Sequence, residues 1–421
     1  MNCQSLLNIM KARIVVLILI VILLPILSKK LNGQANNLTP QNRFFEVQSI
    51  DTMKYSRDTA GEMLTKPSFD DVIDQQVKNI AGTGATHVAI GTPYDNQFIP
   101  FLARWVKVAR RYKLKVWFRG NLSGWEGWFG YEKINREQHK QGIRAFITKN
   151  SNLFEDGDIF SSCPECENGG PGDPRQTGDI DGHRKFLIAE YELTKEAFKE
   201  IGKNVRSNYF SMNGDVAQLI MDPQTTAALD GIVVIDHYVS SPTQMVDDIK
   251  TIADKSGGKV VLGEFGAPIP DIHGNMNQDE QAQWIQDALS QLTYTKQLTG
   301  LNYWTSVGGS AEIWDSQGRE RKAVSVIRDY FSPKVIQGTI TNRLGRPLKN
   351  ALVSDNQSSV SVDSKGRFII TYVGDKNKIK VTAPNYLSKE LNVNQSKWNL
   401  HISLEPEEKG FFSFLRMLFS R

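Results

Sequence analysis

The sequence predicts an α/β chain: a (β/α)8 TIM barrel followed by a small β-sandwich, with a transmembrane or signal-anchor helix at the N-terminus. Short apolar strands alternate with amphipathic helices eight times within residues 44–331, as a barrel requires. Residues 335–404 then show short alternating strands with turn residues between them, which is typical of a small sandwich. Residues 14–27 are continuously apolar apart from Pro25.

We therefore divide the 421 residues into five segments. These are a signal-anchor or signal peptide (1–33), a linker (34–42), a (β/α)8 barrel (43–332), a β-sandwich (333–405) and a hydrophobic tail (406–421). The apolar run is shorter than the ~20 residues of a spanning helix and fits a secretory h-region. Because Lys29 and Lys30 follow it, we expect an uncleaved anchor with a single membrane pass and the bulk outside the cytoplasm. Secretion after signal cleavage is the alternative.

The expected barrel elements follow in chain order. The strands are 44–50, 87–90, 115–118, 158–163, 205–209, 232–235, 259–266 and 301–304. The helices are 70–81, 98–112, 136–149, 186–201, 223–229, 242–253, one beginning at Asn277, and 323–330.

Helical spacing and end signals support these elements. In the first helix, Val72, Ile73, Val77 and Ile80 recur at helical intervals, and the pattern Asn277-x-x-Glu280 is a capping box. The short helix 223–229 begins at a proline, which suits the first turn. A doubly wound sheet is the rival architecture, but the residues after the first strand form no glycine-rich phosphate loop.

Composition narrows the function classes. The chain carries 50 basic and 46 acidic residues, so it has no nucleic-acid footprint. Of its three cysteines, Cys163 and Cys166 form a C-x-x-C pair, which is a disulfide, a redox motif or half a metal site. No second Cys pair or His pair completes a zinc site. We therefore expect a closed disulfide or two free thiols, and neither a metal nor an organic cofactor.

The ends of barrel strands face one shared mouth, and the sequence places polar and aromatic residues there. The candidate site residues are Arg119, Glu165, Asn208, Asp236, His237, Tyr238, Glu264 and Trp304. Glycoside cleavage needs one acid to protonate the leaving oxygen and a second carboxylate to attack or to activate water. Arg119 and Tyr238 are expected to keep Glu264 ionised, and Trp304 offers an apolar face to a sugar ring.

Three of these motifs resemble the glycoside hydrolases of clan A over roughly residues 44–331. They are Gly263-Glu264-Phe265-Gly266, Asp236-His237-Tyr238 and Tyr303-Trp304. The resemblance implies a retaining (β/α)8 enzyme in which Glu264 is the nucleophile and the acid/base lies on strand four. It also implies that His237, Tyr238 and Trp304 contact substrate, and that Arg119 acts as the basic residue near the nucleophile.

Strand four departs from the family pattern of Asn-Glu, because this chain has Pro164-Glu165. Glu165 stands where the acid is expected, and Glu167 is the alternative acid/base. The missing Asn normally grips the sugar hydroxyl beside the cleaved bond, an interaction that strengthens in the transition state. The sequence thus predicts a retaining hydrolase of O-glycosidic bonds in a poly- or oligosaccharide. A carbohydrate-binding protein without catalysis, and a surface scaffold, are the alternatives.

Each of these residues also has an alternative interpretation as a structural residue. Glu264 and Glu165 are read alternatively as structural acids, His237 as a core histidine and Trp304 as a cap on the barrel core. The glycine-spaced aromatic loop 122–131 predicts either a saccharide platform or a lid packed on its neighbours. The sequence predicts no particular oligomeric state.

The C-terminal segment resembles the carboxypeptidase regulatory-like (transthyretin-like) module. The resemblance depends on Gly338, residues 345–353 and residues 363–368, and it implies a spacer or binding module without chemistry of its own. Residues 410–421 are rich in Phe and Leu but too short to span a bilayer. They are expected either to lie in a membrane interface or to dock on the protein.

Overall fold

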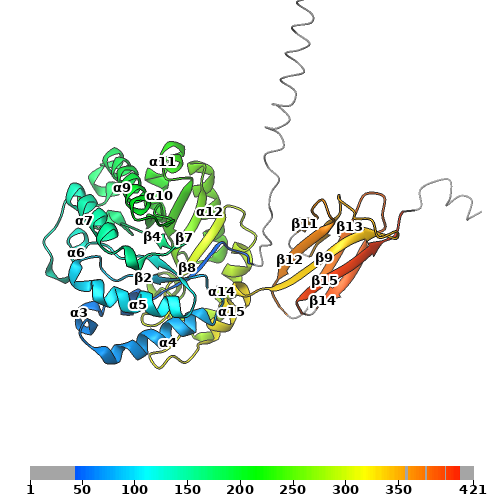
Figure 1. The fold of residues 1–421 in the computed structure, drawn as a ribbon, viewed down its shortest axis with the longest axis horizontal. Helices are drawn as coiled ribbons and strands as arrows, with labels where there is room; N and C mark the ends of the chain where they lie inside the picture. Colours follow the sequence, from blue (N-terminus) through cyan, green and yellow to red (C-terminus); the bar gives the residue numbers. More distant parts are fainter. Residues whose placement is uncertain (1–42, 356–358, 375–376, 394, 408–421) are drawn as a thin grey trace, which may run out of the picture. The chain divides into compact units, whose positions relative to one another are not determined.

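The computed structural model describes residues 43–355, 359–374, 377–393 and 395–407, which hold a barrel and a β-sandwich (Figure 1). The predicted anchor and linker, and the tail from residue 408, lie outside the described residues. Within the described part of the chain, no helix has the length and apolar character to cross a membrane. The barrel and the sandwich are described separately below.

The barrel is built on an eight-stranded parallel sheet in the order β4-β3-β2-β1-β8-β7-β6-β5. Its strands are β1 (Val47–Asp51), β2 (His87–Ile90), β3 (Lys115–Phe118), β4 (Ile159–Phe160), β5 (Ser211–Asn213), β6 (Ile232–Asp236), β7 (Lys259–Phe265) and β8 (Leu298–Tyr303). A parallel bridge between Ile159 and Arg206 joins β4 to the segment before β5. This bridge closes the sheet, so the predicted barrel is present.

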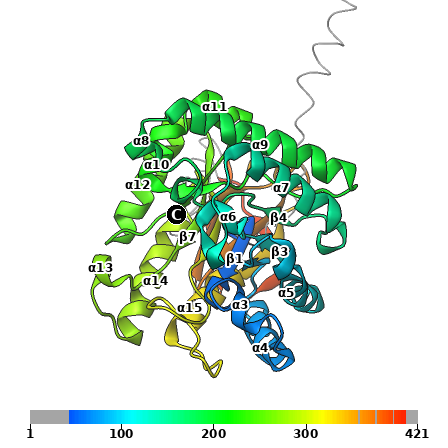
Figure 2. The same ribbon diagram turned by 90° about the vertical axis from the view of Figure 1, so that its left-hand side faces the viewer.

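Helices form an outer ring around the strands (Figure 2). They are α2 (Met53–Ser56), α3 (Ala60–Met63), α4 (Asp70–Ala81), α5 (Ile99–Arg111), α6 (Ser123–Glu126), α7 (Arg136–Lys149), α8 (Pro174–Thr177), α9 (Ile180–Glu200), α10 (Gly214–Ile220), α11 (Pro223–Ala228), α12 (Pro242–Ser256), α13 (Pro270–His273), α14 (Gln278–Leu292) and α15 (Lys322–Phe331). Short 3-10 turns are η1 (Pro67–Phe69), η2 (Asn96–Phe98), η3 (Trp128–Gly130), η4 (Ser151–Leu153) and η5 (Cys166–Asn168). The predicted capping box of α14 is present between Asn277 and Glu280.

The inside of the barrel is filled by an apolar layer with a polar layer above it. The apolar layer takes one buried side chain from most strands: Val47, Ala89, Trp117, Ile159, Tyr209, Val234 and Val261. Because side chains alternate along a strand, the residues two positions further on also point inward. These include Ser49, Arg119, Ser161, Ser211, Asp236 and Asn302, all buried. The barrel is therefore closed by apolar packing below and carries its polar chemistry at the carboxyl ends of the strands.

The predicted strand five is wrong by several residues. Residues 205–209 were expected to form it, because apolar Val205 and Tyr209 flank polar neighbours. The structure instead places β5 at Ser211–Asn213, and the earlier segment contributes only the bridge at Arg206. Tyr209 still points into the barrel, where its ring meets Trp117 edge-on at 5.3 Å. Backbone hydrogen bonds also hold this segment beside β4, from the Phe160 amide to Arg206 O at 2.8 Å and from the Arg206 amide to Asp158 O at 3.0 Å.

The β-sandwich consists of two sheets that share one apolar core. One sheet has the order β11-β10-β13-β14 and the other β12-β9-β15. The strands are β9 (Lys334–Asn342), β10 (Leu352–Ser354), β11 (Ser359–Ser361), β12 (Arg367–Tyr372), β13 (Asn377–Thr382), β14 (Lys389–Val393) and β15 (Lys397–Leu404). Ile336 and Phe368 of one sheet belong to the same buried cluster as Val353 and Val381 of the other. The predicted sandwich architecture is therefore present.

Candidate active site

A buried arginine organises the carboxyl ends of the strands. Arg119 directly follows β3 and has no exposed surface. Its Nη1 lies 2.9 Å from both Asp51 Oδ2 and Glu264 Oε1. Its Nη2 lies 3.0 Å from Asp236 Oδ2 and donates to Ser211 Oγ at 3.1 Å. Such a charge is tolerated only when it is paired and hydrogen-bonded, and here carboxyls from three strands pair with it.

Glu264 reaches this cluster because β7 is irregular at its end. Gly263 continues the inward alternation of the strand, so a regular strand would turn Glu264 outward. The pairing register of β7 shifts between Leu262 and Phe265, and such bulges re-aim side chains. One carboxylate oxygen of Glu264 contacts Arg119, and the other accepts a 2.7 Å hydrogen bond from Tyr238 Oη. Both contacts stabilise negative charge on a residue that is only 8% exposed.

Asp236 behaves differently from its neighbour Glu264. Burial raises the pKa of Asp236 well above its usual range, the Arg119 cation opposes this, and repulsion from Glu264 adds to it. Because one buried cation faces three carboxyls, burial and repulsion from Glu264 outweigh the Arg119 cation in setting the direction of this pKa shift. Gly263 lies against it, because a Cβ there would stand 2.3 Å from Asp236 Oδ1.

Glu165 lies in a tight loop after β4. A disulfide joins Cys163 and Cys166 on either side of it, and Glu165 itself adopts a left-handed backbone with φ 46°. Its amide donates to Ser211 O at 2.7 Å, and Asn168 Nδ2 donates to its Oε2 at 3.0 Å. The side chain is partly exposed. Burial, and then repulsion from Glu264, raise the pKa of Glu165.

Glu167, the alternative acid, is the more enclosed of the two. It is 2% exposed, and its Oε1 accepts a 2.7 Å hydrogen bond from the Asn213 amide. Its Oε2 is buried without a hydrogen-bond partner among the described residues. Burial raises the pKa of Glu167 to about 7. A nearly inaccessible carboxyl of this kind is less suited than Glu165 to meet a substrate.

Two aromatic side chains stand beside the carboxyl cluster. The rings of Tyr238 and Trp304 meet edge-on with centroids 6.1 Å apart. Trp304 is half-buried, and Lys54 Nζ lies 5.6 Å from its ring centroid. Tyr238 thus connects Trp304, at the end of β8, with the Glu264 carboxylate.

The structure does not bring two of the predicted residues to this cluster. Asn208 is buried and donates to the Leu229 carbonyl, in the turn that precedes β6. This contact lies at the amino end of β6, away from the barrel mouth. Asn208 was expected at the mouth only because strand five was predicted to end beside it. His237 Nε2 lies 2.9 Å from Asp248 Oδ2 on the outer helix α12. Asp236 does lie in the cluster, but it is buried against Arg119.

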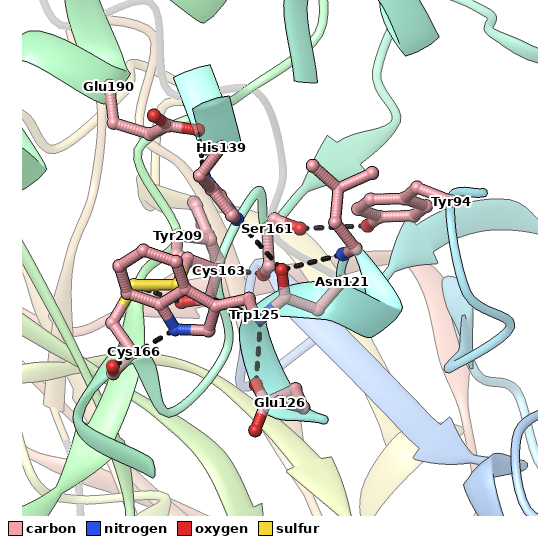
Figure 3. Close-up of a disulfide and its surroundings, with 11 residues drawn as sticks. Tyr94, Asn121, Trp125, Glu126, His139, Ser161, Cys163, Cys166, Glu190 and Tyr209 are labelled. Carbon is pink, nitrogen blue, oxygen red and sulfur yellow. Dashed lines mark hydrogen bonds and ion pairs between the residues drawn. A yellow bond between two sulfur atoms is a disulfide. The ribbon is translucent and has the colours of Figure 1, made fainter. Parts of the chain in front are cut away.

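The aromatic loop 122–131 has one buried part and one exposed part. Trp125 is buried and stacks on Phe186 with centroids 5.1 Å apart. Its Nε1 donates to the Cys166 carbonyl at 3.2 Å, beside the disulfide (Figure 3). Phe129 and Tyr131, further along the loop, are exposed. The first half of the loop is therefore packed on the Glu165 loop, and the second half faces solvent.

Sequence reasoning missed several residues of the site. Ser211 was hidden by the misplaced strand five, whereas Asp51 was not missed, because it ends β1 and strand ends face the barrel mouth. Asn302 donates to Asp51 Oδ2 at 3.1 Å and to the Gly263 carbonyl at 2.9 Å, and it is identified by the two-residue alternation of β8. Glu126 ends α6 in the aromatic loop, where no local pattern distinguishes it from a surface acid.

The arrangement supplies two carboxyls in different surroundings. Glu264 accepts hydrogen bonds from a cation and from a hydroxyl, while Glu165 has a raised pKa and is partly accessible. Such a pair can deliver a proton from one group and negative charge from the other. Among the described residues, no group of three or more His, Cys, Asp or Glu is arranged to hold a metal ion.

No protein-family model and no curated protein matches the chain. Solved structures do match it. A GH5_18 protein from Bifidobacterium longum subsp. longum, in complex with Manβ1-4GlcNAc, is 14% identical and superposes over 72% of this chain and 84% of its own, with a TM-score of 0.52. A GH5_18 protein from Bifidobacterium longum subsp. infantis is 12% identical over 72% and 84% of the two chains, with a TM-score of 0.51.

A third match is a GH5_18 protein from Streptomyces cattleya in complex with GlcNAc. It is 12% identical over 70% of this chain and 83% of its own, with a TM-score of 0.50. At these identities the likeness establishes the fold alone, which is a (β/α)8 barrel.

Proposed function

We propose that the chain is a retaining glycoside hydrolase that cleaves O-glycosidic bonds of a poly- or oligosaccharide. The observation that carries the proposal is the pairing of Glu264, held by Arg119 and Tyr238, with a partly exposed Glu165 whose pKa is raised by burial and by Glu264. The similar GH5_18 structures hold Manβ1-4GlcNAc or GlcNAc, which supports a carbohydrate as the substrate.

In the first step Glu264 attacks the anomeric carbon and forms a glycosyl ester. The bond to the leaving oxygen breaks, and Glu165 gives its proton to that oxygen. In the second step the Glu165 carboxylate removes a proton from water, which attacks the same carbon and releases Glu264. The raised pKa of Glu165 suits the first role because the group keeps a proton closer to neutral pH.

A panel of chromogenic glycosides, in both anomers, tests this proposal. The unaltered chain is expected to hydrolyse at least one member, and Glu264→Gln to lose at least about a thousandfold in kcat while its melting temperature stays close to that of the parent. Gln keeps the size of Glu264 and its contact with Tyr238 but cannot attack. Undiminished hydrolysis by the variant would remove this mechanism.

A second candidate is a carbohydrate-binding protein that does not cleave. Pro164 favours it, because the residue before the acid offers no side-chain amide to a sugar hydroxyl. This candidate predicts binding of an oligosaccharide by calorimetry, with no product after prolonged incubation. The first candidate predicts product with the parent chain and none with Glu264→Gln.

We also propose that the barrel works outside the cytoplasm, tethered by the apolar run 14–27, or secreted after cleavage of that run. The Cys163–Cys166 disulfide supports an oxidising compartment. For the sandwich we propose a carboxypeptidase regulatory-like spacer or binding module, which its two-sheet architecture supports.

A further inference from the structure

A line of polar side chains runs from the helical shell of the barrel to its mouth (Figure 3). Glu190 Oε1 on α9 lies 3.2 Å from His139 Nδ1 on α7. His139 Nε2 lies 2.8 Å from Asn121 Oδ1, just after β3. Asn121 Nδ2 then donates to Glu126 Oε1 at 2.7 Å. The line thus ends on a carboxyl of the aromatic loop.

The contacts of Asn121 determine which atoms donate and which accept hydrogen bonds along this line. Asn121 Oδ1 also accepts from the Leu122 amide at 2.8 Å, so it is the amide oxygen and His139 Nε2 must donate to it. His139 Nδ1 therefore faces Glu190 Oε1 at 3.2 Å. Both side chains are completely buried, and their contact is a close approach without hydrogen-bond geometry. Because Asn121 Oδ1 accepts from His139 and from the Leu122 amide, the NH2 group of Asn121 is turned towards Glu126.

The same loop is joined to the loop that carries Glu165. Asn121 Nδ2 lies 3.8 Å from Cys163 Sγ, and Trp125 Nε1 donates to the Cys166 carbonyl at 3.2 Å. The Trp125 carbonyl accepts from the Gly170 amide at 3.1 Å. Glu126 is thereby held beside the loop of Glu165. In keeping with this, burial and then repulsion from Glu165 raise the pKa of Glu126 to about 7.

Glu126 retains capacity to bind a ligand. The residue is only partly buried, and its Oε1 is occupied by Asn121, whereas its Oε2 makes no hydrogen bond within the described residues. Packing of α7 against α9 would explain the pair His139–Glu190. It would not explain why the line continues through Asn121 to a partly exposed carboxyl with a spare acceptor oxygen.

We propose that Glu126 binds the departing sugar, accepting a hydrogen bond from one of its hydroxyl or amide N–H groups, and that Asn121, His139 and Glu190 are positioning residues for it. The inference rests on the proposed function, since Glu165 protonates the leaving oxygen and the departing group must therefore lie on the Glu165 side. A sugar leaving group offers such donors, whereas an aryl group offers none. Glu126 is thus expected to distinguish between these two kinds of leaving group.

Two probes of the same sugar and anomer test this inference. One is the 4-nitrophenyl glycoside that the protein cleaves best, and the other is the corresponding 1,4-linked disaccharide. Because the amide NH2 group that takes the place of Oε2 cannot accept a hydrogen bond, Glu126→Gln is expected to lower kcat/KM for the disaccharide about 10-fold to 100-fold more than for the aryl glycoside. Asn121→Ala, which frees Glu126 from its donor, is expected to shift the ratio in the same direction by a smaller factor.

Glu132→Gln is the matched control. Glu132 lies on the same loop, is exposed and makes no side-chain hydrogen bond among the described residues, so both kcat/KM values should stay within twofold of the parent. If Glu126→Gln lowers the two values equally, or leaves their ratio unchanged, this inference is overturned while the proposed function stands. If the parent chain cleaves neither probe, nor any other glycoside, both are overturned. Should Glu126→Gln fail to fold, Glu126→Asp serves the same comparison.

Discussion

At the scale of single residues, the site depends on one buried cation that three carboxyl groups share. Arg119 meets Asp51, Asp236 and Glu264 in a space without solvent. Burying charges costs several kcal/mol for each ion, so an uncompensated third carboxylate would be unstable there. The raised pKa of Asp236 reflects this excess, and Glu264, at 8% exposed, is the member of the set with the most access to solvent. The same electrostatic argument applies to Glu167 and Glu126, whose burial raises their pKa values to about 7.

Glu167 makes this argument testable through the pH dependence of stability. Its folded-state pKa of about 7 lies above the ordinary 4.5, so the folded chain binds the proton more tightly than the unfolded chain. Its contribution is therefore fully present below about pH 4.5 and is lost as the pH rises through 7. Glu167→Gln cannot ionise, so we expect it to exceed the parent in free energy of unfolding by about 1–3 kcal/mol at pH 8.

Urea unfolding at pH 8 and at pH 4.5 measures this difference. The advantage of Glu167→Gln should disappear at pH 4.5, where the parent carboxyl is protonated, while Glu132→Gln should show no advantage at either pH. An advantage of equal size at both values would mean that charge on Glu167 is not its cause.

At the scale of elements, the end of β7 connects the backbone with the chemistry. The register shift near Glu264 brings this side chain to Arg119, and Gly263 leaves room for Asp236 behind it. A Cβ at Gly263 would lie 2.3 Å from Asp236 Oδ1 and 2.9 Å from Ser211 Cβ. These distances are too short for real contacts, so neighbouring strands would have to move.

Gly263→Ala is therefore expected to destabilise the barrel by about 1–3 kcal/mol and to reduce turnover, because Asp236 is displaced from Arg119. Thermal unfolding and hydrolysis of the best chromogenic glycoside measure both effects. Gly61→Ala in α3 is the control, since a Cβ there meets only the Phe129 ring at 3.5 Å. Equal behaviour of the two variants would contradict the crowding described at β7.

The bounds of helices and strands were predicted correctly where the apolar spacing of a helix extends over several turns or where a strand is regular. The helices α4 and α7 and the strands β2 and β3 have the predicted bounds, because their apolar spacing is unbroken. Strand five was misplaced, since the predicted segment forms only a bridge at Arg206 and the regular pairing begins at Ser211. Asn208 was misassigned for this reason.

Prediction of the site had a similar limit. The strand-end rule brings Arg119, Tyr238 and Glu264 together, and the structure places these three in contact. It also selected His237, which turns to α12 instead, because the rule does not specify side-chain direction after a strand has ended. Glu126 was not predicted, since its position depends on Asn121, which contacts His139 on α7, and His139 in turn contacts Glu190 on α9.

At the scale of the whole molecule, one barrel provides both stability and chemistry in separate layers. The apolar layer around Trp117 and Tyr209 fills the interior, and the polar layer above it holds the carboxyls and Arg119. Residues from β1, β3, β6 and β7 thus meet although they lie far apart in the sequence. Because the two layers are separate, residues of the polar layer can be substituted while the apolar layer keeps the barrel folded.

The proposed tether is also a property of the whole chain. We expect the full-length chain to sediment with membranes on high-speed centrifugation and to remain there in 1 M salt, because an apolar anchor is not displaced by ions. A chain that begins at residue 43 should stay in the supernatant with its melting temperature unchanged. Release of the full-length chain by salt alone would contradict an apolar anchor, whereas a shortened chain in the culture medium would indicate signal cleavage.

The covalent role of Glu264 is the central claim, and trapping the glycosyl ester tests it most directly. A 2-deoxy-2-fluoro glycoside with a good leaving group, of the sugar that the panel identifies, slows hydrolysis of the ester more than its formation. Mass spectrometry of the digested protein is expected to find one added fluorosugar on the peptide that contains Glu264. A label on another residue, or turnover of the chromogenic substrate with no labelled peptide, would contradict the account.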